Sequence, residues 1–481
     1  MNKEKTIGWN FDNSYSNLPK SFIYEISPVP VKRPELVILN HDLADQMGLN
    51  FSNVDNEQLA KMFSGNLLPK GSKSLAQAYA GHQFGHFTML GDGRAVLLGE
   101  HISKSNQRLD VQFKGSGQTP FSRNGDGRAA LGPMLREYLI SEAMHSLNIP
   151  TTRSLAVVKT GENVIREKPL QGAILTRVAS SHIRVGTFQF IRTRENLDEL
   201  NTLVNYTIKR HYPEISKSKN NAYDLLSKLI DKQIELVVNW MRVGFIHGVM
   251  NTDNMAISGE TIDYGPCAFM DSYNLGTCFS SIDHMGRYAY GNQPAITKWN
   301  LARFAECLLT LINPNKDDAL KMATELIDKF DKIYEEKWFN MMKSKLGLIG
   351  DYKEDNLIIF ELLEIMKKQE LDYTNTFLFL MDHEIDDKKS YQNEEFDNWK
   401  MKWQKRLTKD SKNLMELNNP VIIPRNHNVE NVLKSAENND LTPFNDLLQA
   451  LKNPYTNQKV LNKYQSPPPK SDEKYQTFCG T

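Results

Sequence analysis

The sequence predicts an α+β protein of two lobes, a strand-rich amino-terminal lobe followed by a helical carboxy-terminal one. Two observations lead to this prediction. Short apolar and alternating segments follow one another between residues 83 and 178, with one helical segment among them. From about residue 195 onward, apolar residues recur at helical spacing instead. Strands that come first and helices that come later are typical of the α+β class.

The first strands are expected within residues 83–101, QFGHFTMLGDGRAVLLGEH. We place them on either side of a Gly-Asp-Gly turn at residues 91–93, because mirror-image hairpin turns need the positive φ that glycine adopts easily. A third strand follows and ends at Lys114, since the apolar residues of RLDVQFK alternate. Residues 1–75 are predicted to be loop-rich, because prolines interrupt any long helix there.

A helix and two further strands complete the first lobe. Pro133 is well placed at a helix start, and apolar residues then recur at spacing four until Pro150 ends the helix. The two strands are expected at residues 154–159 and 171–178, on either side of a turn at Gly161. The order of three strands, one helix and two strands is that of the amino-terminal lobe of a protein kinase.

The second lobe is predicted to be almost wholly helical. Its longest periodic segment, NAYDLLSKLIDKQIELVVNWMRVGF, covers residues 221–245, and residues 296–450 read as further helices. The chain ends in a polar, proline-interrupted tail that carries Cys479. We expect such a tail to be mobile unless something fastens it.

Composition excludes several classes of protein. Lys+Arg and Asp+Glu are both 58, so no overall positive field draws the chain to nucleic acid or to an anionic membrane. No apolar run is long enough to cross a bilayer, and the first residues lack the core of a signal peptide, which predicts a cytoplasmic protein. Four cysteines without C-x-x-C spacing indicate neither a disulfide framework nor a zinc site.

Residues 247–265, HGVMNTDNMAISGETIDYG, nearly spell a phosphoryl-transfer site. A protein-kinase catalytic loop reads H-R-D-L-x-x-x-N and is followed by D-F-G. Asn254 falls at the offset of that Asn, and Asp263 begins a D-Y-G, so these two residues could share a Mg²⁺ ion with nucleotide phosphates. Val249 stands where a kinase has its catalytic Asp. Asp253 is therefore the candidate general base, against the simpler role of capping a turn.

Basic residues of the first lobe could hold phosphates. Lys114 follows Arg94 and the Gly-Asp-Gly turn much as a kinase lysine follows its glycine-rich loop. Its helix partner is Glu137 or Glu142, and periodicity does not decide between them, because both helix faces have apolar neighbours.

Two further arginines and a pair of histidines are also candidates for ligand contacts. Arg177 and Arg184 could clamp phosphates bidentately, although surface arginines are common. His82 and His86 have a metal-like spacing, but flanking glycines disfavour a helix there and no third ligand is present, so we reject a zinc site.

Long ungapped segments of this chain resemble the selenoprotein O family of protein adenylyltransferases. They include YAGHQFGHFTMLGDGRA, FKGSGQTPFSRNGDGRAAL, REYLISEAM, LTRVASSHIRVGTF, HGVMNTDNMAISGETIDYGP and DHMGRYAYGNQP. The resemblance implies a two-lobed protein-kinase-like fold with an N-terminal extension and a helical C-terminal addition. We accordingly expect an irregular extension over 1–80, an N-lobe over 81–180, a C-lobe with the catalytic and metal loops over 181–320, and a helical region with a cysteine-bearing tail over 321–481.

In that family ATP binds in a flipped orientation, and AMP is transferred to Ser, Thr or Tyr hydroxyls of proteins. The resemblance implies that Asp253 accepts the hydroxyl proton, that Asn254 and Asp263 bind Mg²⁺ or Mn²⁺, and that Glu137 pairs with the lysine. It also implies a set of nucleotide contacts: Gly91, Gly93, Arg94, Lys114, Asp126, Gly127, Arg177, Arg184 and Asp263. A base placed for transfer of the γ-phosphate would be useless here, which accounts for Val249.

The same resemblance implies a disulfide at the end of the chain. Cys479 occupies the place of a cysteine or selenocysteine near the family's C-terminus, and Cys278 is its expected disulfide partner. The alternative is two free thiols, which a reducing cytosol favours.

Two other functions are alternatives to AMP transfer. They are a conventional kinase that transfers the γ-phosphate and a non-catalytic pseudokinase scaffold. UTP could replace ATP as the nucleotide.

Overall fold

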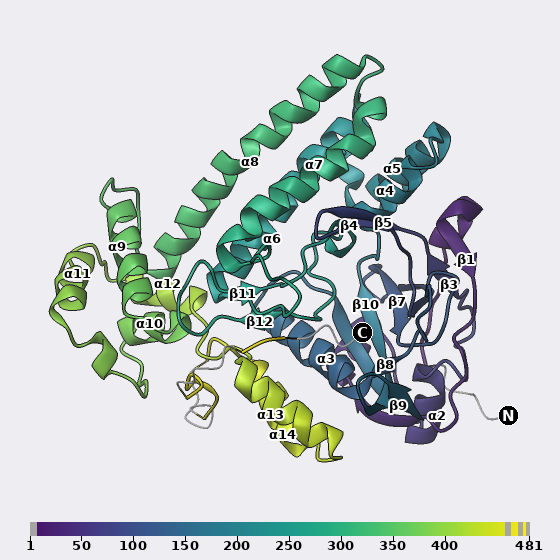
Figure 1. Cartoon of the computed structure of the whole chain (residues 1–481), viewed down its shortest axis with the longest axis horizontal. Coiled ribbons are helices and arrows are strands. Elements are labelled where there is room, and N and C mark those ends of the chain that lie inside the picture. Colours follow the sequence, from purple (N-terminus) through teal and green to yellow (C-terminus); the bar gives the residue numbers. More distant parts are fainter. Residues whose placement is uncertain (1–6, 457–462, 470–474, 478–481) are drawn as a thin grey trace.

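The computed structural model describes residues 7–456, 463–469 and 475–477 and has two lobes (Figure 1). One lobe is built on an eight-stranded sheet in the order β1-β3-β6-β7-β10-β9-β2, with β8 paired to β10. All of its strand pairs are antiparallel. The strands are β1 (Ile23–Glu25), β2 (Glu35–Leu39), β3 (Leu75–Gln77), β6 (Ala95–Ile102), β7 (Arg108–Lys114), β8 (Ala129–Ala130), β9 (Arg153–Ile165) and β10 (Pro169–Ala179).

Helices cover both faces of this sheet because its central strands are apolar on both sides. Val157 and Leu175 lie in one buried cluster with α3 (Leu131–Ser146). Their neighbours Val158 and Ile174 lie in another, with α1 (His41–Met47) and α2 (Asn56–Phe63). Successive strand residues point to opposite faces, so this alternation fixes the sheet between two helical layers. The predicted strand ending at Lys114 and the helix between Pro133 and Pro150 are both confirmed.

The hairpin predicted around the Gly-Asp-Gly segment is wrong. Strand β5 (His86–Met89) pairs with β4 (Ala80–Gln83) and not with β6, and the turn between them lies at Phe84 and Gly85, which have φ values of 50° and 89°. The ladder continues as Leu90 N–H donates to the carbonyl of Tyr79 at 3.0 Å. Residues 91–94 therefore connect β5 to β6 without forming a hairpin turn, and Asp92 N–H donates to the carbonyl of Gln77 at 2.9 Å.

The turn predicted at Gly161 is also wrong. Strand β9 runs through Gly161 to Ile165, and the reversal lies before Pro169. The residue does have a positive φ of 72°, but a Cβ atom there would lie 2.6 Å from the backbone oxygen of Arg33. Glycine is needed for the close approach of another segment within an irregular part of the β9–β10 ladder, and not for a chain reversal.

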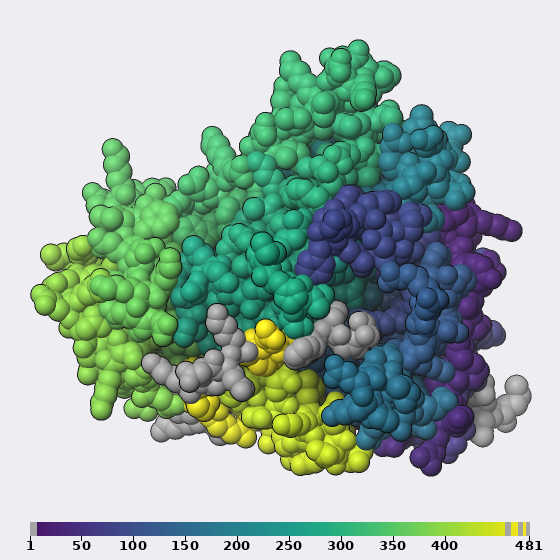
Figure 2. Space-filling model, in the orientation of Figure 1, coloured from purple at the N-terminus to yellow at the C-terminus, as the bar shows by residue number. Residues whose placement is uncertain are grey.

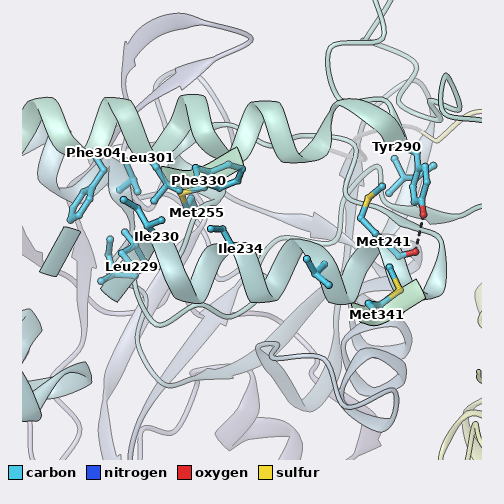
Figure 3. Close-up of a cluster of buried hydrophobic side chains, with 14 of the residues drawn as sticks. Leu229, Ile230, Ile234, Met241, Met255, Tyr290, Leu301, Phe304, Phe330 and Met341 are labelled. Atoms are coloured by element: carbon cyan, nitrogen blue, oxygen red, sulfur yellow. Dashed lines mark hydrogen bonds between the residues drawn. The ribbon is translucent and has the colours of Figure 1, made fainter. Parts of the chain in front are cut away.

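The helical lobe is organised around three long helices, as predicted from residue 195 onward. They are α6 (Asn221–Val243), α7 (Gln293–Ile312) and α8 (Lys316–Lys345), preceded by α4 (Val185–Arg192) and α5 (Leu197–His211). Figure 3 shows their shared core, in which Ile230 of α6, Phe304 of α7 and Phe330 of α8 belong to one buried cluster. The Tyr290 hydroxyl donates to the carbonyl oxygen of Met241 at 2.8 Å and fixes the end of α6. Two short strands, β11 (Phe245–Ile246) and β12 (Ala268–Phe269), pair with each other. Residues 247–267 between them form the catalytic segment, which carries the catalytic loop and the D-Y-G.

The remaining helices extend the second lobe and return to the first. They are α9 (Asp355–Lys368), α10 (Tyr373–Leu380), α11 (Glu394–Gln404), α12 (Ser411–Asn418), α13 (Asn426–Glu437) and α14 (Thr442–Leu451). Helices α13 and α14 lie beside α3 (Figure 1), and Val429 and Phe444 share a buried cluster with Leu135. Helix α3 is thus covered by the sheet on one side and by the C-terminal helices on the other, which explains its two apolar faces.

Short 3-10 helices connect these elements: η1 (Tyr15–Asn17), η2 (Lys20–Phe22), η3 (Pro213–Ile215), η4 (Thr252–Asn254), η5 (Tyr290–Asn292) and η6 (Lys389–Tyr391). The architecture is the two-lobed, protein-kinase-like α+β fold that the sequence predicts, with a helical C-terminal addition. Residues 7–80 contribute β1, β2, β3, α1 and α2. The four-part division of the chain at residues 80, 180 and 320 stays a prediction.

Candidate active site

A cavity of about 710 Å³ lies between the two lobes. All eleven residues that the sequence singles out for nucleotide, metal or proton line it: Gly91, Gly93, Arg94, Lys114, Asp126, Gly127, Arg177, Arg184, Asp253, Asn254 and Asp263. Seven Lys or Arg side chains but only four Asp side chains belong to its wall, an excess of three positive charges. Such a wall suits a polyanion.

Lys114 forms the centre of a buried charge cluster. Its Nζ lies 2.6 Å from a carboxylate oxygen of Glu137 and 2.6 Å from one of Asp263. Glu142, the alternative that the sequence left open, pairs with Arg153 at 2.7 Å instead. Lys114 on β7, Glu137 on α3 and the aspartate of the D-Y-G segment thus meet as the corresponding residues of an active protein kinase do.

Asp263 receives cations from both lobes. Arg177 donates to its Oδ1 at 2.8 Å, and Arg184 lies 3.7 Å from Oδ2. Burial opposes ionisation of this carboxyl, but Lys114 and the two arginines outweigh it and hold its pKa well below the ordinary value. The backbone of Asp263 has a φ of 65°, a left-handed conformation that aims the carboxylate into the cavity.

Two buried arginines line the cavity where the lobes join. Arg177 on β10 and Arg184 at the start of α4 are each only 2% exposed. Arg177 also donates to Gln112 at 2.6 Å, and the Arg184 guanidinium lies 4.4 Å from the ring centroid of Tyr79. These contacts fix both guanidinium groups in place, so this end of the cavity is cationic where a nucleobase would need an apolar wall.

Asp253 and Asn254 share η4 on the catalytic loop. Asp253 is buried, and its Oδ1 has no hydrogen-bond partner among the described residues. Burial raises the pKa of this carboxyl to about 6, although Arg184 opposes the shift. The side-chain N–H of Asn254 donates to the carbonyl of Val249 at 3.0 Å. The side-chain oxygen of Asn254 takes no part in this bond.

The donor set of the catalytic segment fits a divalent cation. The amide oxygen of Asn254 and the Oδ2 of Asp263 are hard oxygen ligands, and Oδ1 of Asp263 is engaged by Lys114 and Arg177. Two protein ligands, completed by nucleotide phosphates and water, are the shell that Mg²⁺ usually has in phosphoryl-transfer sites. Within the described ranges, no group of three or more His, Cys, Asp or Glu residues has metal-binding geometry.

Two glycine-containing loops pack face to face above the cavity. A Cβ atom on Gly91 would lie 2.3 Å from the ring of Phe121, and one on Gly93 would lie 2.8 Å from the Phe121 carbonyl oxygen. The Thr119 hydroxyl also donates to the carbonyl of Asp92 at 2.6 Å. Glycine is therefore required for the two loops to meet. Their contact brings residues 121–128 into the cavity wall.

Sequence reasoning missed several charged and aromatic residues of this wall: Tyr79, Asp92, Arg123, Arg128 and Arg166. One signal was available, because the pentapeptide GDGRA occurs twice, at residues 91–95 and again at 125–129. Arg166 pairs with Asp126 at 2.9 Å across the cavity rim. Arg128 donates to the carbonyl oxygens of Val29 and Pro30, and Tyr79 lies against Arg184; no local pattern reveals such contacts between distant segments.

Residues 475–477, the last that the structure describes, lie beside residues 279–281, which follow the D-Y-G segment in the chain. Thr477 N–H donates to the carbonyl of Phe279 at 2.8 Å, and Ser281 N–H donates to the carbonyl of Thr477 at 3.0 Å. The Tyr475 hydroxyl donates to Glu430 at 2.7 Å. Cys278 adjoins this contact, but Cys479 lies outside the described residues, so the disulfide between them stays a prediction.

Comparison with known proteins identifies the group to which this site belongs. A family model described as "Protein adenylyltransferase SelO" matches residues 5–452. The chain belongs to the SelO family. Among curated SelO-family relatives, a "Protein nucleotidyltransferase YdiU" of Pelagibacter ubique (strain HTCC1062) is 65% identical, and the alignment covers 99% of this chain and 100% of that protein.

Further SelO-family proteins align over the full length. The proteins of the same description from Nitrosococcus oceani and Clostridium perfringens (strain ATCC 13124) are each 55% identical, over 100% of this chain and 99% of theirs. A solved structure, ROP2 from Toxoplasma gondii, described as having a protein-kinase fold and no enzymatic activity, aligns over 68% of this chain and 86% of its own, with 10% identity and a TM-score of 0.25. Among the described residues, no helix has the length and apolar character needed to span a membrane.

Proposed function

We propose that this SelO-family chain transfers AMP from ATP to Ser, Thr or Tyr hydroxyls of other proteins. The acceptor oxygen forms a bond to the α-phosphorus, the bond between that phosphorus and the bridging oxygen breaks, and pyrophosphate leaves. The hydroxyl proton passes to a carboxylate of the enzyme. Family membership and the descriptions of the curated relatives support nucleotidyl transfer to proteins.

One observation supports a flipped nucleotide in particular: the buried guanidinium groups of Arg177 and Arg184 at the end of the cavity where the lobes join. In this proposal the β- and γ-phosphates lie against these arginines and Lys114. An adenine ring there would have to lie against three buried cations without neutralising their charge, which is strongly unfavourable. The triphosphate end is therefore innermost, and the nucleoside points outward.

The remaining roles follow from this orientation. Gly91, Gly93, Arg94, Asp126 and Gly127 line the outer cavity and would contact the nucleotide there. The α-phosphorus would lie near the catalytic segment, open to an incoming hydroxyl. Asp253 is the proposed proton acceptor. A carboxyl with a pKa of about 6 is mostly ionised at neutral pH and is a stronger base than an ordinary aspartate.

A divalent cation, Mg²⁺ or Mn²⁺, would be held by Asn254 and Asp263. When bound, it supplies positive charge that stabilises the leaving pyrophosphate. Three cations of the protein already hold the Asp263 carboxylate in place without a ligand. Binding of nucleotide and metal therefore requires little rearrangement of this side chain.

The decisive experiment compares ATP labelled at the α-phosphate with ATP labelled at the γ-phosphate. The purified chain is incubated with each in a desalted bacterial extract, with Mg²⁺ or Mn²⁺ and with excess UTP in a parallel sample. We expect protein-bound label from the α position only, and none with Lys114→Ala or Asp263→Ala. Label from the γ position would identify a conventional kinase, and label from neither would identify a binding scaffold. Loss of label in the presence of UTP would show that UTP competes with ATP for the site.

A further inference from the structure

The β4–β5 hairpin leaves the sheet lobe and lies on the catalytic loop of the helical lobe. Strand β4 packs against both α4 and η4. In Figure 2 the blue surface of this part of the chain borders the green surface of the helical lobe. The hairpin therefore covers the loop that carries Asp253, in addition to connecting β3 and β6 of the main sheet.

Gly81 of β4 touches the Asp253 carboxylate directly. A Cβ atom at residue 81 would lie 2.2 Å from Oδ1 and 2.8 Å from Cγ of Asp253. The glycine hydrogen in that direction thus points at the carboxylate oxygen, in the manner of a weak Cα–H···O contact. This is the same oxygen that has no hydrogen-bond partner among the described residues. One oxygen of the carboxylate is held against backbone, while the aspartate still lines the cavity.

Gly186 allows an equally close approach on the other side of strand β4, between this strand and helix α4. A Cβ atom on Gly186, in the first turn of α4, would lie 2.0 Å from the carbonyl oxygen of Ala80 and 3.3 Å from Cα of Asp253. Strand β4 is therefore enclosed between α4 and η4, with no room for a methyl group at Gly81 or at Gly186. Its φ at Gly81 is not in the left-handed region, so glycine is needed there for space alone.

Hydrogen bonds fasten the hairpin in this position. His82 N–H donates to the Thr252 hydroxyl at 2.7 Å, and Phe84 N–H donates to the side-chain oxygen of Asn251 at 3.1 Å. The Thr252 hydroxyl donates in turn to Gln189 at 2.6 Å. The backbone of β4 and the residues next to Asp253 thus form one network, which fixes the catalytic loop relative to the sheet lobe.

We infer that the β4–β5 hairpin is a positioning element for Asp253, in which Gly81 sets the location of the carboxylate by allowing backbone contact. The inference rests on the proposed function, since it assigns the carboxylate the task of taking the acceptor proton. In this proposal Gly81 contacts neither the nucleotide nor the acceptor hydroxyl and acts only through Asp253. A methyl group at residue 81 has to push the two apart by roughly 1 Å to reach ordinary contact distance.

The test is Gly81→Ala, with Thr88→Ala as matched control. Thr88 is the cross-strand partner of Gly81 on β5, and among the described residues its side chain donates only to the carbonyl of His86 in the same strand. We expect kcat for transfer of α-labelled AMP to fall about a hundredfold in Gly81→Ala, as is typical for misplacement by about 1 Å, while the ATP dissociation constant from calorimetry stays within about two-fold. Thr88→Ala should retain the kcat of the unmodified chain.

A second variant covers the case in which Gly81→Ala does not fold. Thr252→Val removes both the acceptor of the His82 N–H and the donor to Gln189 without adding bulk. We expect kcat to fall at least about five-fold, the effect of one neutral hydrogen bond, again with unchanged ATP binding. Unchanged kcat in the variant that folds would overturn the inference, and so would equal losses of kcat and ATP affinity. Absence of α-label transfer by the unmodified chain would instead refute the proposed function.

Discussion

Arg177 and Asp263 form a partly buried ion pair across the two lobes, with 2.8 Å between Nη1 and Oδ1. Arg177 belongs to strand β10, and Asp263 lies between β11 and β12. The arginine also reaches Glu137 at 3.3 Å, so one guanidinium joins the sheet, helix α3 and the D-Y-G segment. A site assembled in this way before ligand arrives loses little conformational entropy on binding.

Replacing Arg177 by methionine should weaken ATP binding about ten- to a hundredfold, because a hydrogen bond to a charged group contributes about 1.5–3 kcal/mol. The proposed function places the phosphates against this side chain. Calorimetric titration of ATP into Arg177→Met measures the change directly.

Arg153→Met is the matched control for this variant. Arg153 lies on the neighbouring strand β9 and pairs with Glu142, also a glutamate of α3, but it does not line the cavity. Its ATP affinity should equal that of the unmodified chain. A similar loss in both variants would mean that the ion pairs of α3 affect the cavity only through general stability.

The two glutamates of α3 should separate catalysis from stability. Glu137→Gln removes the charge that faces Lys114 and Arg177, so we expect kcat/KM to fall about ten- to a hundredfold. Glu142→Gln should leave kcat/KM unchanged and lower the free energy of unfolding by about 1–3 kcal/mol, since it weakens a partly buried bond to Arg153. Steady-state kinetics and denaturant titration of both variants measure the two effects, and the reverse assignment would contradict the structure.

Local patterns were enough to predict the elements that carry the site. Alternation predicted the strand that ends at Lys114, and the two prolines bounded α3. The choice between Glu137 and Glu142 could not be made from periodicity, because α13 and α14 bury the face of α3 that would otherwise be exposed. That burial depends on residues almost 300 positions away in the chain.

Contacts between distant segments also explain the wrong predictions. Glycines in the sequence indicated turns at residues 91–93 and at Gly161, but both segments use glycine for close approach, to Phe121 and to Arg33 respectively. The true hairpin turn includes Phe84, whose N–H is bonded to Asn251 of the other lobe. A positive φ at phenylalanine is unfavourable in isolation, so only this tertiary contact makes that turn the preferred one.

Removal of divalent cations should abolish transfer without abolishing nucleotide binding. Lys114, Arg177 and Arg184 remain to hold the β- and γ-phosphates when a chelator is present, whereas the charge of the leaving pyrophosphate is no longer neutralised. We expect no transfer of α-label in EDTA and a measurable but weaker ATP affinity. Mg²⁺ should improve the ATP affinity of Asn254→Ala less than that of the unmodified chain, because the variant keeps only one of the two proposed ligands. An equal improvement in both would exclude Asn254 as a ligand.

His182 should make the fold less stable in mild acid. It is buried in the connection between the lobes, where its Nδ1 lies 3.0 Å from Asp110, and it also faces the charges of Arg177 and Arg184. Burial lowers its pKa to about 4, despite the opposing effect of Asp110. An unfolded histidine titrates near a pKa of about 6.5, so between these values the unfolded chain binds a proton that the native chain does not. The free energy of unfolding therefore falls as the pH falls from 6.5 towards 4.

The size of this effect can be isolated with His182→Asn, whose amide still donates to Asp110. The slope reaches about 1.4 kcal/mol per pH unit only below the unfolded pKa, so one such histidine removes about 1.6 kcal/mol between pH 6.5 and pH 5. Urea titrations at these two pH values should give a decrease in stability that is smaller by about this amount in His182→Asn than in the unmodified chain. The exposed His284→Asn serves as control and should keep the original decrease. Equal decreases in His182→Asn and in the unmodified chain would show that His182 is protonated alike in both states.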